Sequence, residues 1–189
     1  MDFFYDLILF PGKAIYSLSR KEPGYGGFAV LLLACLSSTA ARILISGSSA
    51  GMAIFSLTWG LTARLLLIVL AFLFASSFYH FFAGAAGGRG SSLKLFSALP
   101  YSSLPFVFSC PAVLISRVFI TGPGLLVPVF LLLLFLVWAV YIQSQIISYF
   151  YGMSKTDALA VFMLPWVIIS AVSVVVPVII GTGLFILIL

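Results

Sequence analysis

The few charged residues of this chain are confined to short segments that separate long apolar stretches. Only 7% of the 189 residues are charged, whereas 63% are hydrophobic. A soluble domain carries about 25% charged residues, so the composition indicates a membrane protein. Backbone polar groups must be satisfied internally in lipid, and the apolar stretches lack the alternation of barrel strands, so the sequence predicts an all-α transmembrane bundle. The charges within the apolar stretches are Arg42, Arg64 and Arg117.

A hydrocarbon core about 30 Å thick needs roughly 20 apolar residues per helix. The chain offers five such stretches, at about 26–46, 61–82, 101–120, 125–149 and 158–187. The last stretch is longer than one straight crossing, so we expect kinks at Pro165 and Pro177 or a tail that emerges near 181–183. Residues 51–60 are expected to form an outer interfacial or re-entrant piece, with Arg64 reaching outward from the start of the second span.

The basic residues identify the two sides of the membrane, because cytoplasmic segments carry an excess of Lys and Arg. The polar segments on the side of the N-terminus contain Lys13, Arg20, Lys21, Arg89, Lys94 and Lys155. We therefore expect residues 1–189 to form one transmembrane domain, with a cytoplasmic N-terminus, an outer turn at 121–124 and the C-terminus outside. The same rule accounts for the net charge of +5, so nucleic-acid binding is not expected.

Residues 2–20 have the pattern of an amphipathic helix. Polar side chains such as Asp6, Lys13 and Arg20 fall within an arc of about 60° on a helical wheel, and apolar ones such as Ile15 fill the opposite half. Such a helix lies in the membrane interface, and Pro11 predicts a kink in it. The alternative is a helix that packs on the transmembrane bundle, and the pattern favours neither arrangement over the other.

Arg42, Arg64 and Arg117 all fall in the outer half of the predicted bundle, where the sequence offers no acidic residue to pair with them. The planar guanidinium group matches the geometry of phosphate oxygens. One interpretation is therefore a binding site for an anionic lipid headgroup or an anionic solute. The alternative is that each arginine ends its own helix and reaches the interface independently of the others.

A second group of polar residues lies in the inner halves of spans two and four. His80, Tyr141, Gln143 and Gln145 predict a polar cavity there. The alternative is hydrogen bonding between helices, with a neutral His80 bonded to a backbone carbonyl. No span contains a carboxylate that could form an acid–base pair with His80, and two cysteines and one histidine are too few for a metal site. We therefore expect no enzymatic activity and no cofactor.

Short motifs flank the third and fifth spans. A glycine pair with a basic residue precedes span three, and a tyrosine and then a proline follow as it begins: Gly87, Gly88, Arg89, Gly90, Tyr101 and Pro105. Trp138 with Tyr141, the turn at 152–158 and the segment 11–14 complete the pattern. In order and spacing these motifs, which extend over nearly the whole chain, resemble those of the Yip-domain family of small polytopic membrane proteins.

The resemblance implies a five-span membrane protein without catalysis that organises membrane or binds partner proteins or lipids. Eukaryotic members are tied to trafficking through Rab-type GTPases. This chain lacks their long hydrophilic N-terminal domain, and its segment 6–11 departs from their Asp-Leu-x-Gly-Pro signature, which argues against small-GTPase binding. The compact form is similar to prokaryotic members, which implies a prokaryotic cytoplasmic membrane.

The expected partners are membrane lipids and either another membrane protein or a second copy of the chain. An alternative function is a small channel or transporter for an anionic solute or lipid. This alternative is based on the outer arginines and on the prolines in spans three and five, because broken helices line the binding sites of many transporters.

Overall fold

The computed structural model describes residues 2–20, 25–47, 49–119 and 126–188, which form helices and short connections with no strand among them. Five helical stretches in this part of the chain are long and apolar enough to cross a membrane, which confirms the predicted all-α architecture. The helices are α1 (Asp2–Leu9), α2 (Pro11–Arg20), α3 (Gly26–Ser46), α4 (Ala50–Phe55), the π-helix η1 (Ser56–Gly60), α5 (Leu61–Ala85), α6 (Ser92–Ala98), the 3-10 helix η2 (Leu99–Phe108), α7 (Ser109–Phe119), α8 (Leu126–Tyr151) and α9 (Lys155–Ile188).

The second membrane-spanning stretch begins earlier than the sequence predicts. The backbone is helical from Ala50 to Ala85, because η1 joins α4 directly to α5. Residues 51–60 therefore extend α5 and do not form a separate piece. At this junction Thr58 Oγ1 donates to the Ile54 carbonyl of α4 at 2.9 Å.

The third stretch also differs from the prediction. It begins at Ser92, before the motif tyrosine, and contains the 3-10 segment in which Pro105 lies. The fifth stretch is one helix, and both Pro165 and Pro177 lie inside it. The outer turn predicted at 121–124 lies outside the described residues.

Glycines end α5 and α8 side by side. Gly87 (φ 84°) and Gly152 (φ 64°) adopt the left-handed conformation, which glycine tolerates without strain. In both caps the N–H after the glycine donates to a carbonyl in the last helical turn, at 2.8 and 3.0 Å, as in a Schellman motif. The Arg89 N–H then donates to the Tyr151 carbonyl at 3.2 Å. This bond holds the loop after α5 against the end of α8.

The N-terminal segment consists of two helices that meet at Phe10, with Pro11 as the first residue of α2. Proline suits this position because its missing N–H would have no helical partner there. The apolar side of α2 is buried and α2 packs on α8, so this helix packs on the bundle. In α1, however, Tyr5 and Leu9 are exposed, which leaves part of the predicted interfacial surface free to contact lipid.

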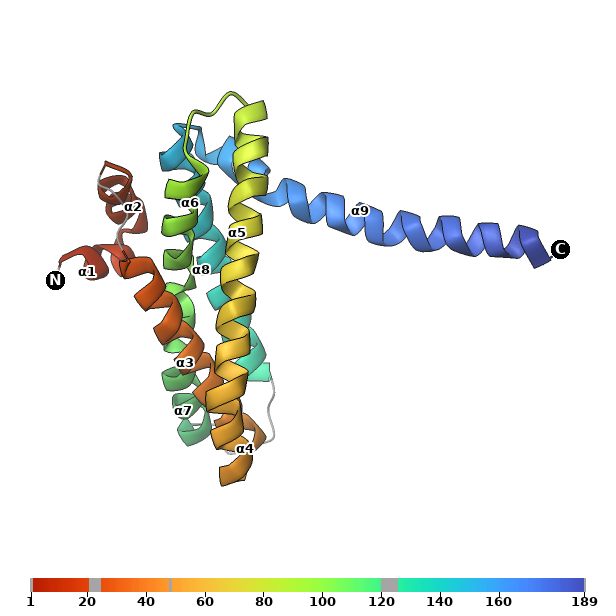
Figure 1. Ribbon diagram of the computed structural model, residues 1–189. Coiled ribbons are helices and arrows are strands. Elements are labelled where there is room, and N and C mark those ends of the chain that lie inside the picture. Colours follow the sequence, from red (N-terminus) through yellow and green to blue (C-terminus); the bar gives the residue numbers. More distant parts are fainter. Residues whose placement is uncertain (1, 21–24, 48, 120–125, 189) are drawn as a thin grey trace.

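The bundle is packed unevenly along its length. We call the end that holds α2 and the caps of α5 and α8 the α2 end, and the opposite end the α4 end (Figure 1). Fully buried apolar side chains concentrate towards the α2 end: Leu95, Leu99, Ile142, Ile146 and Ile147. Cavities lie between the same helices nearer the α4 end. α9 packs on the bundle through its N-terminal part and then extends away from it.

Candidate anion-binding site

Two cavities meet at Arg64, in the space between α3, α5, η2 and α8. The first, of about 510 Å³, extends towards the α2 end as far as Tyr79, and we call it the α2-side cavity. The second, of about 410 Å³, extends towards the α4 end, where Arg42 lines it, and we call it the α4-side cavity. Ser38, Arg64 and Phe106 line both cavities. A ligand at Arg64 can therefore occupy either cavity or both.

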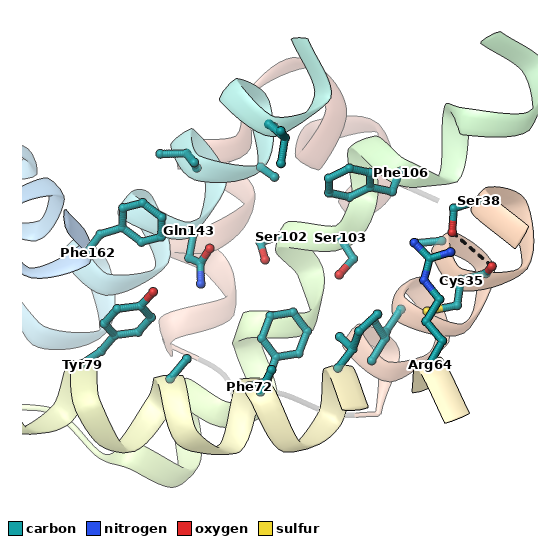
Figure 2. Close-up of a pocket in the computed structure, with 18 of the residues that line it drawn as sticks. Cys35, Ser38, Arg64, Phe72, Tyr79, Ser102, Ser103, Phe106, Gln143 and Phe162 are labelled. Atoms are coloured by element: carbon teal, nitrogen blue, oxygen red, sulfur yellow. Dashed lines mark hydrogen bonds between the residues drawn. The ribbon is translucent and has the colours of Figure 1, made fainter. Parts of the chain in front are cut away.

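The Arg64 side chain points into the bundle, towards Cys35 and Ser38 of α3 (Figure 2). Both of these residues lie near the middle of α3, roughly 12–16 Å from its C-terminal end at 1.5 Å per residue. Arg64 therefore faces a neighbouring helix of the bundle, and its predicted reach outward to the interface stays a prediction. Residue 64 faces α3 because of the rotation of α5, which places the exposed Leu66 and Leu67 on the lipid side.

The structure brings two of the three predicted arginines together. Arg42 and Arg64 both line the α4-side cavity, from α3 and α5 respectively. Arg117 lines neither cavity; its Nη2 donates to the Ile45 carbonyl at 3.3 Å, near the end of α3. Ile45 itself lines the α4-side cavity, so Arg117 lies close to the site but binds the backbone.

The two cavity arginines have no counter-charge in the described part of the protein. No carboxylate lines either cavity, and the ion pair that the structure describes joins Lys13 to Asp6 at 3.3 Å in the N-terminal helices. The described residues also contain no group of three or more His, Cys, Asp or Glu that could hold a metal ion. An unpaired arginine within a membrane span costs about 2.5–3.5 kcal/mol or more. A bound anion would offset this cost.

The predicted polar cavity of His80, Tyr141, Gln143 and Gln145 does not assemble from these residues. Gln143 lines the α2-side cavity, whereas the exposed Tyr141 does not. Gln145 is 2% exposed and lies beneath α2, and its Oε1 has no hydrogen-bond partner among the described residues. His80 bonds to the hydroxyl of Tyr151 (2.9 Å), so its partner is a side chain and not the expected backbone carbonyl.

Sequence reasoning missed the hydroxyl groups that line the site. Ser38 lines both cavities, and Ser102 and Ser103 of η2 line the α2-side cavity. A signal for Ser38 was present, because residues 37–39 form a polar triplet inside an otherwise apolar run. Ser102 and Ser103 lie between the motif tyrosine and Pro105, so the motif contributes directly to the cavity wall.

The motif glycines have a packing role at the α2 end. A Cβ atom on Gly88 would lie 3.1 Å from Cβ of Tyr151, and one on Gly90 would lie 2.8 Å from both the Phe150 carbonyl and the Tyr151 ring. The loop that contains Arg89 therefore packs on Tyr151 through backbone atoms alone. The exposed Arg89 side chain remains available at the surface.

The His80–Tyr151 hydrogen bond is expected to contribute modestly to stability. Replacing His80 with phenylalanine should lower the free energy of unfolding by about 0.5–1.5 kcal/mol, because the Tyr151 hydroxyl loses its partner. Thermal unfolding in detergent measures this change. In a Tyr151→Phe background the same replacement should cost less, and an equal cost in both backgrounds would show that the bond contributes nothing.

Comparison with known proteins agrees with this architecture. Residues 5–187 match the family model of the Yip1 domain, a range that contains all five membrane-spanning stretches. No curated protein and no solved structure matches the chain significantly. The family match confirms the resemblance carried by the sequence motifs. The chain belongs to the Yip1 domain family of membrane proteins.

Proposed function

We propose that this Yip1-domain protein is a non-enzymatic membrane protein that binds a phosphate-bearing anion between Arg42 and Arg64. The observation that carries the proposal is the position of Arg64, which faces the junction of two cavities without a carboxylate in either lining. A cation in such a position is a candidate functional group, because neither the surrounding protein nor the hydrocarbon of the membrane supplies the opposite charge. The ligand that supplies it is a lipid headgroup or a soluble anion.

The physical chemistry of the site favours phosphate. Two guanidinium groups from different helices can each donate parallel N–H bonds to phosphate oxygens, and these bonds are stronger in a medium of low dielectric than in water. Ser109 adds a hydroxyl group to the wall of the α4-side cavity. A zwitterionic headgroup, such as that of phosphatidylcholine, carries a cation beside its phosphate, and the two arginines would repel that cation. We therefore expect the site to bind ligands of net negative charge more tightly than zwitterionic ones.

Lipid binding connects this site with the proposed role of the protein in organising membrane. Tyr5, Leu9 and Phe10 at the N-terminal helices are exposed and can insert between lipids at the interface. With the N-terminus cytoplasmic, as the basic residues predict, the arginine site would face the outer leaflet. A second copy of the chain or another membrane protein remains a proposed partner.

Substitution of Arg64 tests the proposed function. The purified protein in neutral detergent is titrated with phosphatidylglycerol and with phosphatidylcholine of the same acyl chains, and bound lipid is measured by native mass spectrometry. We expect wild type to prefer phosphatidylglycerol by at least about tenfold, and Arg64→Gln to remove most of that preference, because a charge-assisted bond contributes about 1.5–3 kcal/mol. Arg42→Gln should have a similar but smaller effect.

Arg117→Gln is the matched control, because Arg117 lies near the site but lines neither cavity. It should leave the preference unchanged. Calorimetry with inorganic phosphate identifies the source of the anion, since binding of phosphate alone would indicate a soluble ligand. A wild-type protein without preference for the anionic lipid and without affinity for phosphate would overturn the proposal.

A second candidate function is movement of the anion across the membrane. The observation in its favour is that η2, a 3-10 segment containing Pro105, contributes Phe106 to both cavities, as irregular segments of broken helices do in transporters. Vesicles with fluorescent phosphatidylglycerol in one leaflet would show its transfer to the other. Transfer that requires Arg64 would favour this function over binding alone, and an absence of transfer would exclude it for that lipid.

A further inference from the structure

We infer that the α2-side cavity holds an acyl chain of the ligand whose anionic group binds at Arg64, so that the ligand is an anionic lipid. This inference rests on the proposed function, because Arg64 fixes the head of the ligand. It goes further by excluding a soluble anion and by assigning the tail to a defined space. An anionic lipid fits this cavity because a positive charge lies at one end and the lining is apolar along the rest.

The lining of the α2-side cavity suits hydrocarbon. Beyond Arg64, the walls are mostly aliphatic and aromatic side chains from α3, α5, η2, α8 and α9. A cavity of about 510 Å³ with this lining and a charged group at one end has the character of a site for a small amphiphile. Its apolar members include Leu31, Ile68, Phe72, Val140, Phe162 and Trp166.

The cavity is long enough for a whole chain. Arg64 and Tyr79 both line it from α5, and their separation along the helix is about 22 Å at 1.5 Å per residue. One leaflet of a bilayer core is about 15 Å thick, which is the depth that an acyl chain occupies. A lipid with its headgroup between Arg42 and Arg64 therefore has room to extend its chain fully towards Tyr79.

The cavity is also reachable from the lipid. Three residues of its lining, Ala71, Leu136 and Trp166, are exposed on the surface of the bundle. They come from α5, α8 and α9, so the opening faces sideways into the membrane. A lipid chain can enter here without crossing water, whereas a soluble anion would have to cross the apolar rim.

Polar side chains in the lining of the α2-side cavity allow a test of whether the tail of the ligand is pure hydrocarbon. The Gln143 and Ser103 side chains also face this space (Figure 2). A hydrocarbon chain needs neither of them, so Gln143→Leu should preserve or strengthen lipid binding. If the tail instead carried polar groups, the same substitution would weaken binding and overturn the assignment.

Filling the cavity while keeping both arginines tests the inference. Ala75→Phe on α5 and Ala139→Phe on α8 each add bulk to the lining of the α2-side cavity, and the two variants approach it from different helices. Ala63→Phe is the matched control, because Ala63 is exposed on α5 and lines neither cavity. The probes are single-chain phosphatidylglycerols with an octanoyl or a palmitoyl chain, and glycerol phosphate, which has the anionic group without the chain.

We expect wild type and Ala63→Phe to bind the palmitoyl probe at least about tenfold more tightly than the octanoyl probe. Ala75→Phe and Ala139→Phe should reduce or abolish this difference while the proteins keep their thermal unfolding transitions. If Arg64→Gln weakens binding but the two filled variants keep wild-type chain dependence, the proposed anion site stands and the acyl-chain inference falls. If glycerol phosphate binds as tightly as the palmitoyl probe, the inference falls as well.

Discussion

Replacing Ser37 with alanine is expected to lower the free energy of unfolding by about 2–6 kcal/mol, the sum of two hydrogen-bond losses of about 1–3 kcal/mol each. Ser37 Oγ donates to the Val107 carbonyl at 2.6 Å and accepts from the Cys110 N–H at 2.9 Å. Both bonds cross from α3 to the junction of η2 and α7. The Val107 carbonyl needs this donor because Pro111, one turn later, has no N–H, and lipid offers no substitute.

A double-mutant cycle separates this role from general packing. Pro111→Ala restores an N–H that can bond the Val107 carbonyl, so Ser37→Ala should cost clearly less in the Pro111→Ala background. Thermal unfolding in detergent provides the four stabilities. Ser38→Ala is the control, because the Ser38 hydroxyl donates within α3 to the Cys35 carbonyl and does not bond a carbonyl that a proline leaves without a helical partner. If Ser37→Ala lowers the free energy of unfolding equally in both backgrounds, Ser37 does not compensate for the N–H that Pro111 lacks.

The sequence was sufficient for the features that depend on composition and local chemistry. Apolar length predicted five membrane-spanning stretches, and the described residues contain five helical stretches long and apolar enough to cross a membrane. Gly87 and Gly152 adopt left-handed conformations at helix ends, where the glycine-containing segments predicted turns. The apolar side of residues 2–20 was also recognised, although the pattern alone could not tell whether lipid or α8 would cover it, since both are apolar.

The site was harder to predict because α5 and α8 are apolar on every side. Such helices carry no polar stripe to show which side faces the bundle, so the depth of Arg64 could be estimated from the sequence but its direction could not. For the same reason His80 and Gln143, both expected in the inner halves of their spans, were grouped together. The structure places Gln143 in a cavity and His80 at Tyr151, a separation that depends on how the helices are rotated and on their relative depth.

Replacing Gly90 with alanine is expected to destabilise the α2 end by about 1–3 kcal/mol through overpacking. The new Cβ would lie 2.8 Å from the Phe150 carbonyl and 2.8 Å from two ring atoms of Tyr151. The carbonyl belongs to the backbone of α8, and the Tyr151 ring is 2% exposed and bonded to His80. Neither group can move aside freely, so the loop itself must shift. Thermal unfolding in detergent measures the loss.

Two other glycines show whether packing is the cause. Gly84 has open space around its Cβ position and lies in the last turns of α5, so Gly84→Ala should be neutral or stabilising by up to about 1 kcal/mol. Gly87 also has open space but a φ of 84°, which asparagine tolerates better than alanine does. Gly87→Asn should therefore be milder than Gly87→Ala, whereas Gly90→Asn should be at least as damaging as Gly90→Ala. A Gly90 position that tolerates asparagine would mean that the loop does not pack on Tyr151 in the membrane.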